Sequence, residues 1–299
     1  MDIFLAILLD ILEQGLIYGI MALGLYISYK ILNFPDLTVD GSFPLGAAVT
    51  TLFLMQGANP WLALLAAILA GCLAGLMTGV LHVFLKINEL FSGILSMTIL
   101  YSVNLLIVGR SNQPFFDRDT IFNSLPASLI PSAGRGPDFR VAIVAFVIVI
   151  GMKLLLDYFL KTRKGLLLRA AGDNQQVVNA MGIHPGSMKI LGLALANGLV
   201  ALAGAVLAQQ QGFFEVSMGT GIMVMGLASV IMGTVLFTRI SRLSPTTKVL
   251  LGAILYKALV SLAINLGAPA SMLNLVRGVL FLLILLSYQF GQKGGQKHA

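Results

Sequence analysis

Long apolar runs, separated by short polar or charged turns, extend along nearly the whole chain of 299 residues. Crossing roughly 30 Å of hydrocarbon takes about 20 mainly apolar residues in a helix, and helices or closed barrels are needed to satisfy backbone polar groups there. The pattern therefore predicts an all-α polytopic membrane protein with about 8–10 transmembrane helices. Nine crossings are expected, near residues 3–31, 33–54, 61–85, 90–108, 141–160, 190–209, 216–237, 249–266 and 273–288.

Two of these crossings are interrupted. The stretch 33–46, NFPDLTVDGSFPLG, holds two prolines, two glycines and two aspartates ahead of an apolar run that ends near Leu54. That run is short for a full crossing, so a broken helix is expected, with its free backbone groups facing protein or a water-filled cavity. The run 216–237 is punctuated by four glycines and is the second broken or re-entrant candidate.

A weak internal sequence similarity relates the two interrupted regions. The segment EQGLIYGIMALGL resembles ANGLVALAGAVLA, and GSFPLGAAV resembles GTGIMVMGLASV, at an offset of five crossings. An odd offset inverts the second copy in the membrane, as in transporters whose pathway lies at the repeat interface. The chain is therefore expected to be one permease domain, 1–299, with halves 1–160 and 190–299 flanking a loop at 161–189.

The polar and methionine residues of the two breaks are the pathway candidates, although packing explains each of them equally well. They are Asn33, Asp36, Asp40, Ser42, Met223, Met225 and Ser229.

Composition agrees with a membrane protein and sets its orientation. The chain is 58% hydrophobic and only 10% charged, with a mean hydropathy of +0.93, whereas a soluble domain has about 25% charged residues. The net charge of +7 does not suggest nucleic acid binding, because the cations cluster at the ends of spans. Placing the loop 161–189 and the C-terminus in the cytoplasm gives twelve Lys and Arg inside against five outside. The N-terminus and the long loop 109–139 then lie outside.

Catalytic and ion-coupling chemistry is absent from the sequence patterns. The three histidines, His82, His184 and His298, are far apart, and no phosphate-binding loop or nucleophile motif occurs. We therefore expect no metal site, no cofactor and no enzyme activity of the chain's own. Lys153 and Asp157 are one turn apart and can pair. No acidic residue lies in the middle of a clean span, which argues against a proton- or sodium-coupled carrier.

The loop 161–189 is the most informative stretch. Four cations precede a polar run at 172–176, and a short helical patch with one apolar side follows. Asp173 and Asn174 are expected to cap this short helix. Val177, Val178 and Met181 would form an apolar knob, and Gly182 would allow a sharp exit. An ordinary amphipathic connector is the plainer alternative.

The run RAAGDNQQVVNAMGI, followed by ANGLVALAGAVLA, resembles the coupling region of ABC importer permeases of the branched-chain amino-acid and ribose type. The resemblance covers nearly the whole chain. The stretch 33–42 is similar to the family motifs DLSVGS and NFAHG, although this chain inserts Asp40 before Gly41. By this resemblance the loop helix docks in a cleft of an ATPase subunit. The residues that carry the docking role are Ala171, Gly172, Asp173, Asn174, Val178, Ala180, Met181 and Gly182.

The resemblance implies a permease subunit of an ABC importer in the bacterial inner membrane. ATP and Mg²⁺ would be bound by the partner ATPase, and an external or lipid-anchored binding protein would deliver the solute. A second copy or a homologue would complete the pathway. The resemblance favours an amino acid, branched-chain or aromatic, over a sugar or nucleoside, and the VDGSFPLGA variant is similar to the aromatic subgroup. A stand-alone secondary carrier and a membrane-embedded enzyme are the alternatives from other classes.

Overall fold

The computed structural model describes residues 2–124, 139–238, 240, 242–265, 275–276, 278–279 and 281–283. Its elements are α1 (Asp2–Leu25), the π-helix η1 (Tyr26–Ile31), α2 (Val39–Met55), α3 (Pro60–Val83), α4 (Glu89–Val108), β1 (Asn112–Pro114), α5 (Arg140–Lys161), α6 (Arg163–Asp173), α7 (Gln175–Ala180), α8 (Pro185–Gln211), β2 (Phe213–Glu215), the 3-10 helix η3 (Val216–Gly219), α9 (Ile222–Leu236) and α10 (Pro245–Asn265). Most of the predicted crossing at 273–288, and part of the loop 109–139, lie outside the described residues.

Every predicted crossing up to residue 266 coincides with a helix. Among the described residues, seven helical stretches are long and apolar enough to cross a membrane. The eighth, α2, has 17 residues and is too short by that measure. The prediction of an all-helical membrane protein with a shortened second crossing is therefore confirmed.

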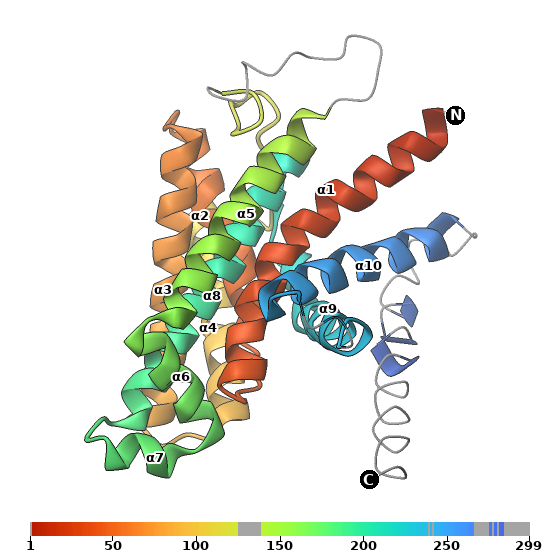
Figure 1. Cartoon of the computed structure of the whole chain (residues 1–299). Helices are drawn as coiled ribbons and strands as arrows, with labels where there is room; N and C mark the ends of the chain where they lie inside the picture. The colour runs from red at the N-terminus through yellow and green to blue at the C-terminus, as the bar shows by residue number, and fades with distance from the viewer. Residues whose placement is uncertain are drawn as a thin grey trace.

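Helix α8 forms the centre of the bundle and packs against α1, α2 and α3 (Figure 1). Nearly all its residues from Gly192 to Gln209 are buried. Small residues allow the close approach, because a Cβ on Gly46, Gly71 or Gly75 would overlap a carbonyl oxygen of α8. In lipid, where apolar side chains gain little by leaving hydrocarbon, such close packing is what holds helices together.

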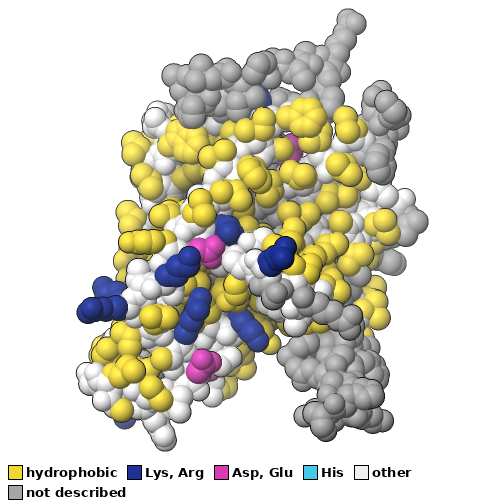
Figure 2. Space-filling view, viewed as in Figure 1, with side chains coloured by type: hydrophobic (Ala, Val, Ile, Leu, Met, Phe, Trp, Pro, Cys, Tyr) yellow, Lys and Arg dark blue, Asp and Glu magenta, His cyan; other side chains and the backbone are white. Residues whose placement is uncertain are grey.

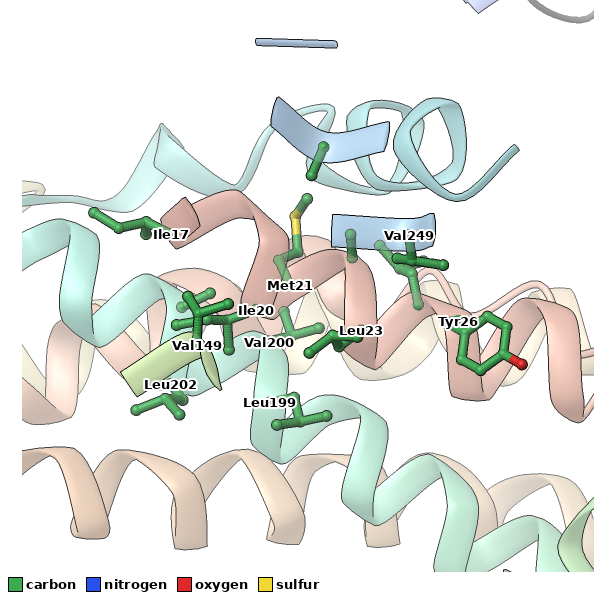
Figure 3. Packing of buried hydrophobic residues seen from close by; sticks show 14 of the residues in the cluster. Ile17, Ile20, Met21, Leu23, Tyr26, Val149, Leu199, Val200, Leu202 and Val249 are labelled. Atoms are coloured by element: carbon green, nitrogen blue, oxygen red, sulfur yellow. The ribbon is translucent and has the colours of Figure 1, made fainter. Parts of the chain in front are cut away.

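A buried apolar seam connects the first helix to the later ones (Figure 3). It brings together Ile17, Ile20, Met21 and Leu23 of α1, Val149 of α5, Leu199, Val200 and Leu202 of α8, and Val249 of α10. Residues from both predicted halves therefore share one core.

Both predicted helix breaks are present. After η1 the chain turns at Asn33, whose φ of 52° lies in the left-handed region, which asparagine tolerates better than most residues. Residues 34–38 are then non-helical until α2 begins. The second break runs through β2 and η3, and Gly221 (φ 77°) precedes α9.

The sequence of a long helix, a non-helical stretch and a shorter helix thus occurs twice, in α1–α2 and in α8–α9. The two long helices run antiparallel, because the Gln210 amide donates to the Glu13 carboxylate near one end, and Gly24 packs on Ala196 farther along. An inverted repeat requires this antiparallel arrangement.

The tight α3–α8 contact gives a stability prediction. Replacing Gly75 with valine should push α3 away from the Leu193 carbonyl and lower the free energy of unfolding by about 1–3 kcal/mol, the usual effect of overpacking. The matched control is Gly151→Val in α5, where an added Cβ would meet no atom within 4 Å. Thermal unfolding in mild detergent should separate the two variants, and equal unfolding temperatures would contradict the packing argument.

Candidate functional site

Two short helices, α6 and α7, lie together at one end of the bundle (Figure 1). Thr162 caps α6, since its Oγ1 accepts a hydrogen bond from the Gly165 N–H at 3.3 Å. Asn174 caps α7 by accepting from the Gln176 N–H at 2.9 Å. The predicted capping role is therefore confirmed for Asn174, whereas Asp173 is the last residue of α6.

The outer surface of α7 differs from the predicted apolar knob. Val177 and Met181 are 44% and 62% exposed, but Val178 is fully buried. A helix of six residues stays in place only if one side is anchored, and Val178 anchors α7 to the protein. The prediction that Val178 offers surface to a partner is therefore wrong. Gly182 has a φ of 75° and makes the turn toward α8, as expected.

Two further loop positions face inward. Ala171 is buried, and a Cβ on Gly172 would overlap the carbonyl oxygen of Ile31. Neither residue presents a side chain to the outside. The predicted docking residues that are exposed are Asp173, Asn174, Ala180, Met181 and Gly182.

The loop is joined to the first helix break. The Asn33 Nδ2 donates to the Gly172 carbonyl at 3.2 Å, beside the close packing of Gly172 on Ile31. Asn33 is exposed at this end of the bundle rather than lining an interior pathway as predicted. The last turn of η1, the break and α6 therefore form one joint, here called the Asn33–Gly172 joint.

A buried hydrogen-bond network stabilises the break. The Asp36 carboxylate accepts from the Thr38 N–H at 2.9 Å and from the Asn197 Nδ2 at 2.7 Å. Ser42 donates to the Asn197 Oδ1 at 2.6 Å. Asp36, Ser42 and Asn197 are all fully buried, so Asp36 and Ser42 hold the break in place. Asn197 was missed in the sequence, although it is the one amide inside the apolar run before Gln209 ends it.

Asp40 connects the two breaks. Its Oδ1 accepts from the Met223 N–H at 2.7 Å, and its Oδ2 accepts from the Gly221 N–H at 3.3 Å. A carboxylate at a helix N-terminus satisfies free N–H groups and the positive end of the helix dipole. The aspartate that this chain inserts relative to the family motif therefore ties α2 to α9.

Beside Asp40 lies a cavity of about 350 Å³, near the lower end of the roughly 300–1,000 Å³ typical of ligand sites. It lies between α2, α4 and η3, and we call it the α4 cavity. Its lining residues are Asp40, Gly41, Pro44, Met97, Thr98, Tyr101, Ser102, Asn104, Val216, Ser217 and Thr220.

Of the seven predicted pathway residues, Asp40 alone lines the α4 cavity. Met225 and Ser229 are buried, and the Ser229 hydroxyl donates to the Met225 carbonyl at 2.8 Å. Met223 packs against the apolar core. The structure accordingly gives these three residues packing roles. The polar residues of α4 were not among the predicted pathway residues, because the prediction for this helix rested on its apolar character.

The other charged clusters form ion pairs that stabilise contacts between helices or within one helix. At the α6–α7 end, the Lys189 ammonium lies 2.8 Å from the Glu89 carboxylate and 3.2 Å from the His82 Nε2. The predicted Lys153–Asp157 pair is confirmed at 3.1 Å. Within the described part of the chain, no three His, Cys, Asp or Glu side chains gather as a metal site would require.

Comparison with known proteins agrees with this architecture. The family model described as branched-chain amino acid transport system / permease component matches residues 7–285. The chain is 42% identical over 278 residues to a tyrosine transport system permease protein of Clostridioides difficile, covering 93% of this chain and 90% of the relative. It is 34% identical over 287 residues to an uncharacterized protein of Rickettsia prowazekii, covering 94% and 97%.

Two solved structures share the fold. PsaBC from Streptococcus pneumoniae, in complex with Fab, matches with a TM-score of 0.54 at 13% identity, over 95% of this chain and 91% of the other. A metal-chelate type ABC transporter in an inward-facing conformation matches with a TM-score of 0.51 at 18% identity, over 94% and 86%. At these identities the likeness concerns the fold alone.

The family assignment excludes the alternatives of a stand-alone carrier and a membrane enzyme, because this permease family lacks an ATPase domain and works with partners that bind ATP and deliver the solute. With helices, breaks and loop arranged as described, and a family model matching residues 7–285, the chain belongs to the branched-chain amino acid transport permease family and is the membrane-spanning subunit of an ABC importer.

Proposed function

We propose that this permease imports an aromatic amino acid of the tyrosine type. The observation that carries the proposal is the 42% identity to a tyrosine transport permease over 93% of the chain. Identity of that extent covers the breaks, the loop and the α4 cavity together, so the parts that contact the solute are included in the likeness.

The ATPase subunit docks on the outer side of α7 in this proposal. The residues that form this α7 surface are all exposed. They are Asp173, Asn174, Val177, Ala180, Met181 and Gly182. Exposed cations on the neighbouring ends of α5 and α6 include Lys161, Arg163 and Lys164, and dark blue side chains gather over that region in Figure 2. The cation excess supports a cytoplasmic location for this end, with the N-terminus outside.

Movement of the ATPase reaches the pathway through the Asn33–Gly172 joint. ATP binding closes the ATPase pair and draws the two α7 helices of a permease dimer together. Val178 and Gly172 are packed into the bundle, so a displacement of α7 also moves the end of η1 and the break before α2. Asp40 then carries the movement to α9. Rocking of the halves 1–160 and 190–299, joined by the loop 161–189, gives alternating access.

Exchanging charges on the α7 surface tests docking. Asp173→Lys combined with Met181→Glu should lower recovery of the ATPase subunit on the tagged permease by about tenfold or more, because the exposed apolar side chain of Met181 is lost and the charge of Asp173 is reversed. Phe116→Glu, at an exposed aromatic on the opposite end, is the control and should leave recovery unchanged. Equal recovery with both variants would remove α7 as the docking element.

Widening the joint tests coupling separately from docking. Gly172→Val should leave ATPase binding intact but lower the solute carried per ATP hydrolysed by about twofold to thirtyfold, the range expected when a coupling path changes by about 0.5–2 kcal/mol. Asn33→Ala should act in the same direction more weakly, since one hydrogen bond is removed. Gly151→Val is the control, and unchanged stoichiometry in both test variants would refute the joint.

Uptake by proteoliposomes tests the solute class. With its ATPase and binding protein, the permease should accumulate labelled tyrosine when ATP is supplied. Unlabelled phenylalanine should compete more strongly than leucine, and ribose should not compete. ATP-driven uptake of a sugar or nucleoside without uptake of tyrosine would overturn the proposed solute.

A further inference from the structure

The polar side of α4 is unusual for a helix at the edge of a membrane bundle. Thr98, Tyr101 and Ser102 lie three and four residues apart near its middle and line the α4 cavity. Tyr101 is 52% exposed. Hydroxyls in the middle of a span are costly against lipid and face protein or a water-filled space. The Thr98 hydroxyl donates to the Ile94 carbonyl of its own helix, whereas the hydroxyls of Tyr101 and Ser102 remain available to a ligand in the cavity.

The cavity also contains an acceptor without a donor. Asn104 is fully buried, and its Nδ2 donates to the Gly41 carbonyl at 3.1 Å. Its Oδ1 has no hydrogen-bond partner. The Asn104 Oδ1 is thus an acceptor beside the cavity without the donor that such a buried group normally has.

The charge carried by the residues that line the α4 cavity is negative. Among its lining residues Asp40 is the ionisable carboxylate, and no Lys, Arg or His contributes to the lining. Asp40 keeps its two hydrogen bonds to the N-terminus of α9 while remaining part of the cavity wall. An ammonium group is the ligand group that would be attracted by the Asp40 charge and by the partial negative charge of the nearby Asn104 amide oxygen.

The rest of the wall divides into two kinds of surface. Thr220 of the second break offers a hydroxyl donor, as a carboxylate requires, whereas the Ser217 hydroxyl donates to the Glu215 carboxylate. Pro44, Met97 and Val216 are apolar and fit an apolar or aromatic side chain. A cavity that combines the Asp40 carboxylate, the Thr220 hydroxyl and an apolar wall is complementary to an α-amino acid.

We propose that the α4 cavity is a solute site within the membrane, where the ammonium group of an amino acid binds beside the Asp40 carboxylate, next to the Asn104 amide. The inference rests on the proposed function and deepens it, because it places part of the solute selection in the permease itself. In this arrangement the bound ammonium lies next to the tie between the two helix breaks. The solute therefore contacts the elements that rock during transport.

Filling the cavity is the first test. Ser102→Trp places an indole in the cavity, whereas Ile99→Trp, on the same helix, places it at an exposed position that does not line the cavity. ATP-driven uptake of labelled tyrosine should fall about tenfold or more in Ser102→Trp and stay within about twofold in Ile99→Trp. Recovery of the ATPase subunit, measured in the same preparations, should be unchanged in both.

The second test removes one hydroxyl oxygen from the cavity wall. Its result does not depend on how the protein accommodates the indole of Ser102→Trp. Tyr101→Phe deletes a hydroxyl at the cavity, and Tyr158→Phe deletes one on the exposed side of α5. The KM for uptake should rise about threefold to tenfold in Tyr101→Phe alone. Equal KM values, together with normal uptake by Ser102→Trp, would overturn the site.

The outcome for the wild type separates this inference from the proposed function. If the wild type carries a different amino acid, the tyrosine proposal fails, and the same four variants are compared with that amino acid. If it carries only solutes without an ammonium group, both proposals fail. If it carries tyrosine but the cavity variants match their controls, the solute class stands and the cavity site is refuted.

Discussion

Hydrocarbon offers no hydrogen-bond partners, so every polar group freed by a helix break has to be satisfied inside the protein. Both breaks in this permease obey that constraint. Asp36 accepts hydrogen bonds from Thr38 and Asn197, and Asp40 accepts from the first residues of α9. The breaks are consequently defined features with fixed partners, and the Asn104 Oδ1, which has none, lies beside the α4 cavity.

Close packing turns these local ties into a mechanical path. Glycines place α3 and α2 directly against the backbone of α8, and Gly172 places α6 directly against η1. Surfaces in backbone contact cannot absorb a displacement by side-chain rotation, because interiors packed this densely transmit strain. In the proposed mechanism a movement of α7 would be passed to the first break, and Asp40 would extend it to the second.

Several parts of this structure could be predicted from the sequence because they follow from local chemistry. Apolar length alone locates the crossings through α10, and proline and glycine locate both breaks. The loop 161–189 is recognisable from its cations, its capping asparagine and Gly182. The inward position of Val178 was missed because a helix of six residues has too few positions to reveal its buried side.

The sequence by itself therefore determined the helical membrane fold, the breaks and the family, since each depends on residues that are neighbours along the chain. Tertiary structure alone decided which distant groups meet: Asp36 with Asn197, Asn33 with Gly172, and Asp40 with the N-terminus of α9. The helices are rich in Gly, Ala and Leu on all sides, so their sequence carries little information about which side faces a neighbour. Long-range packing supplies that information, and with it the position of the α4 cavity.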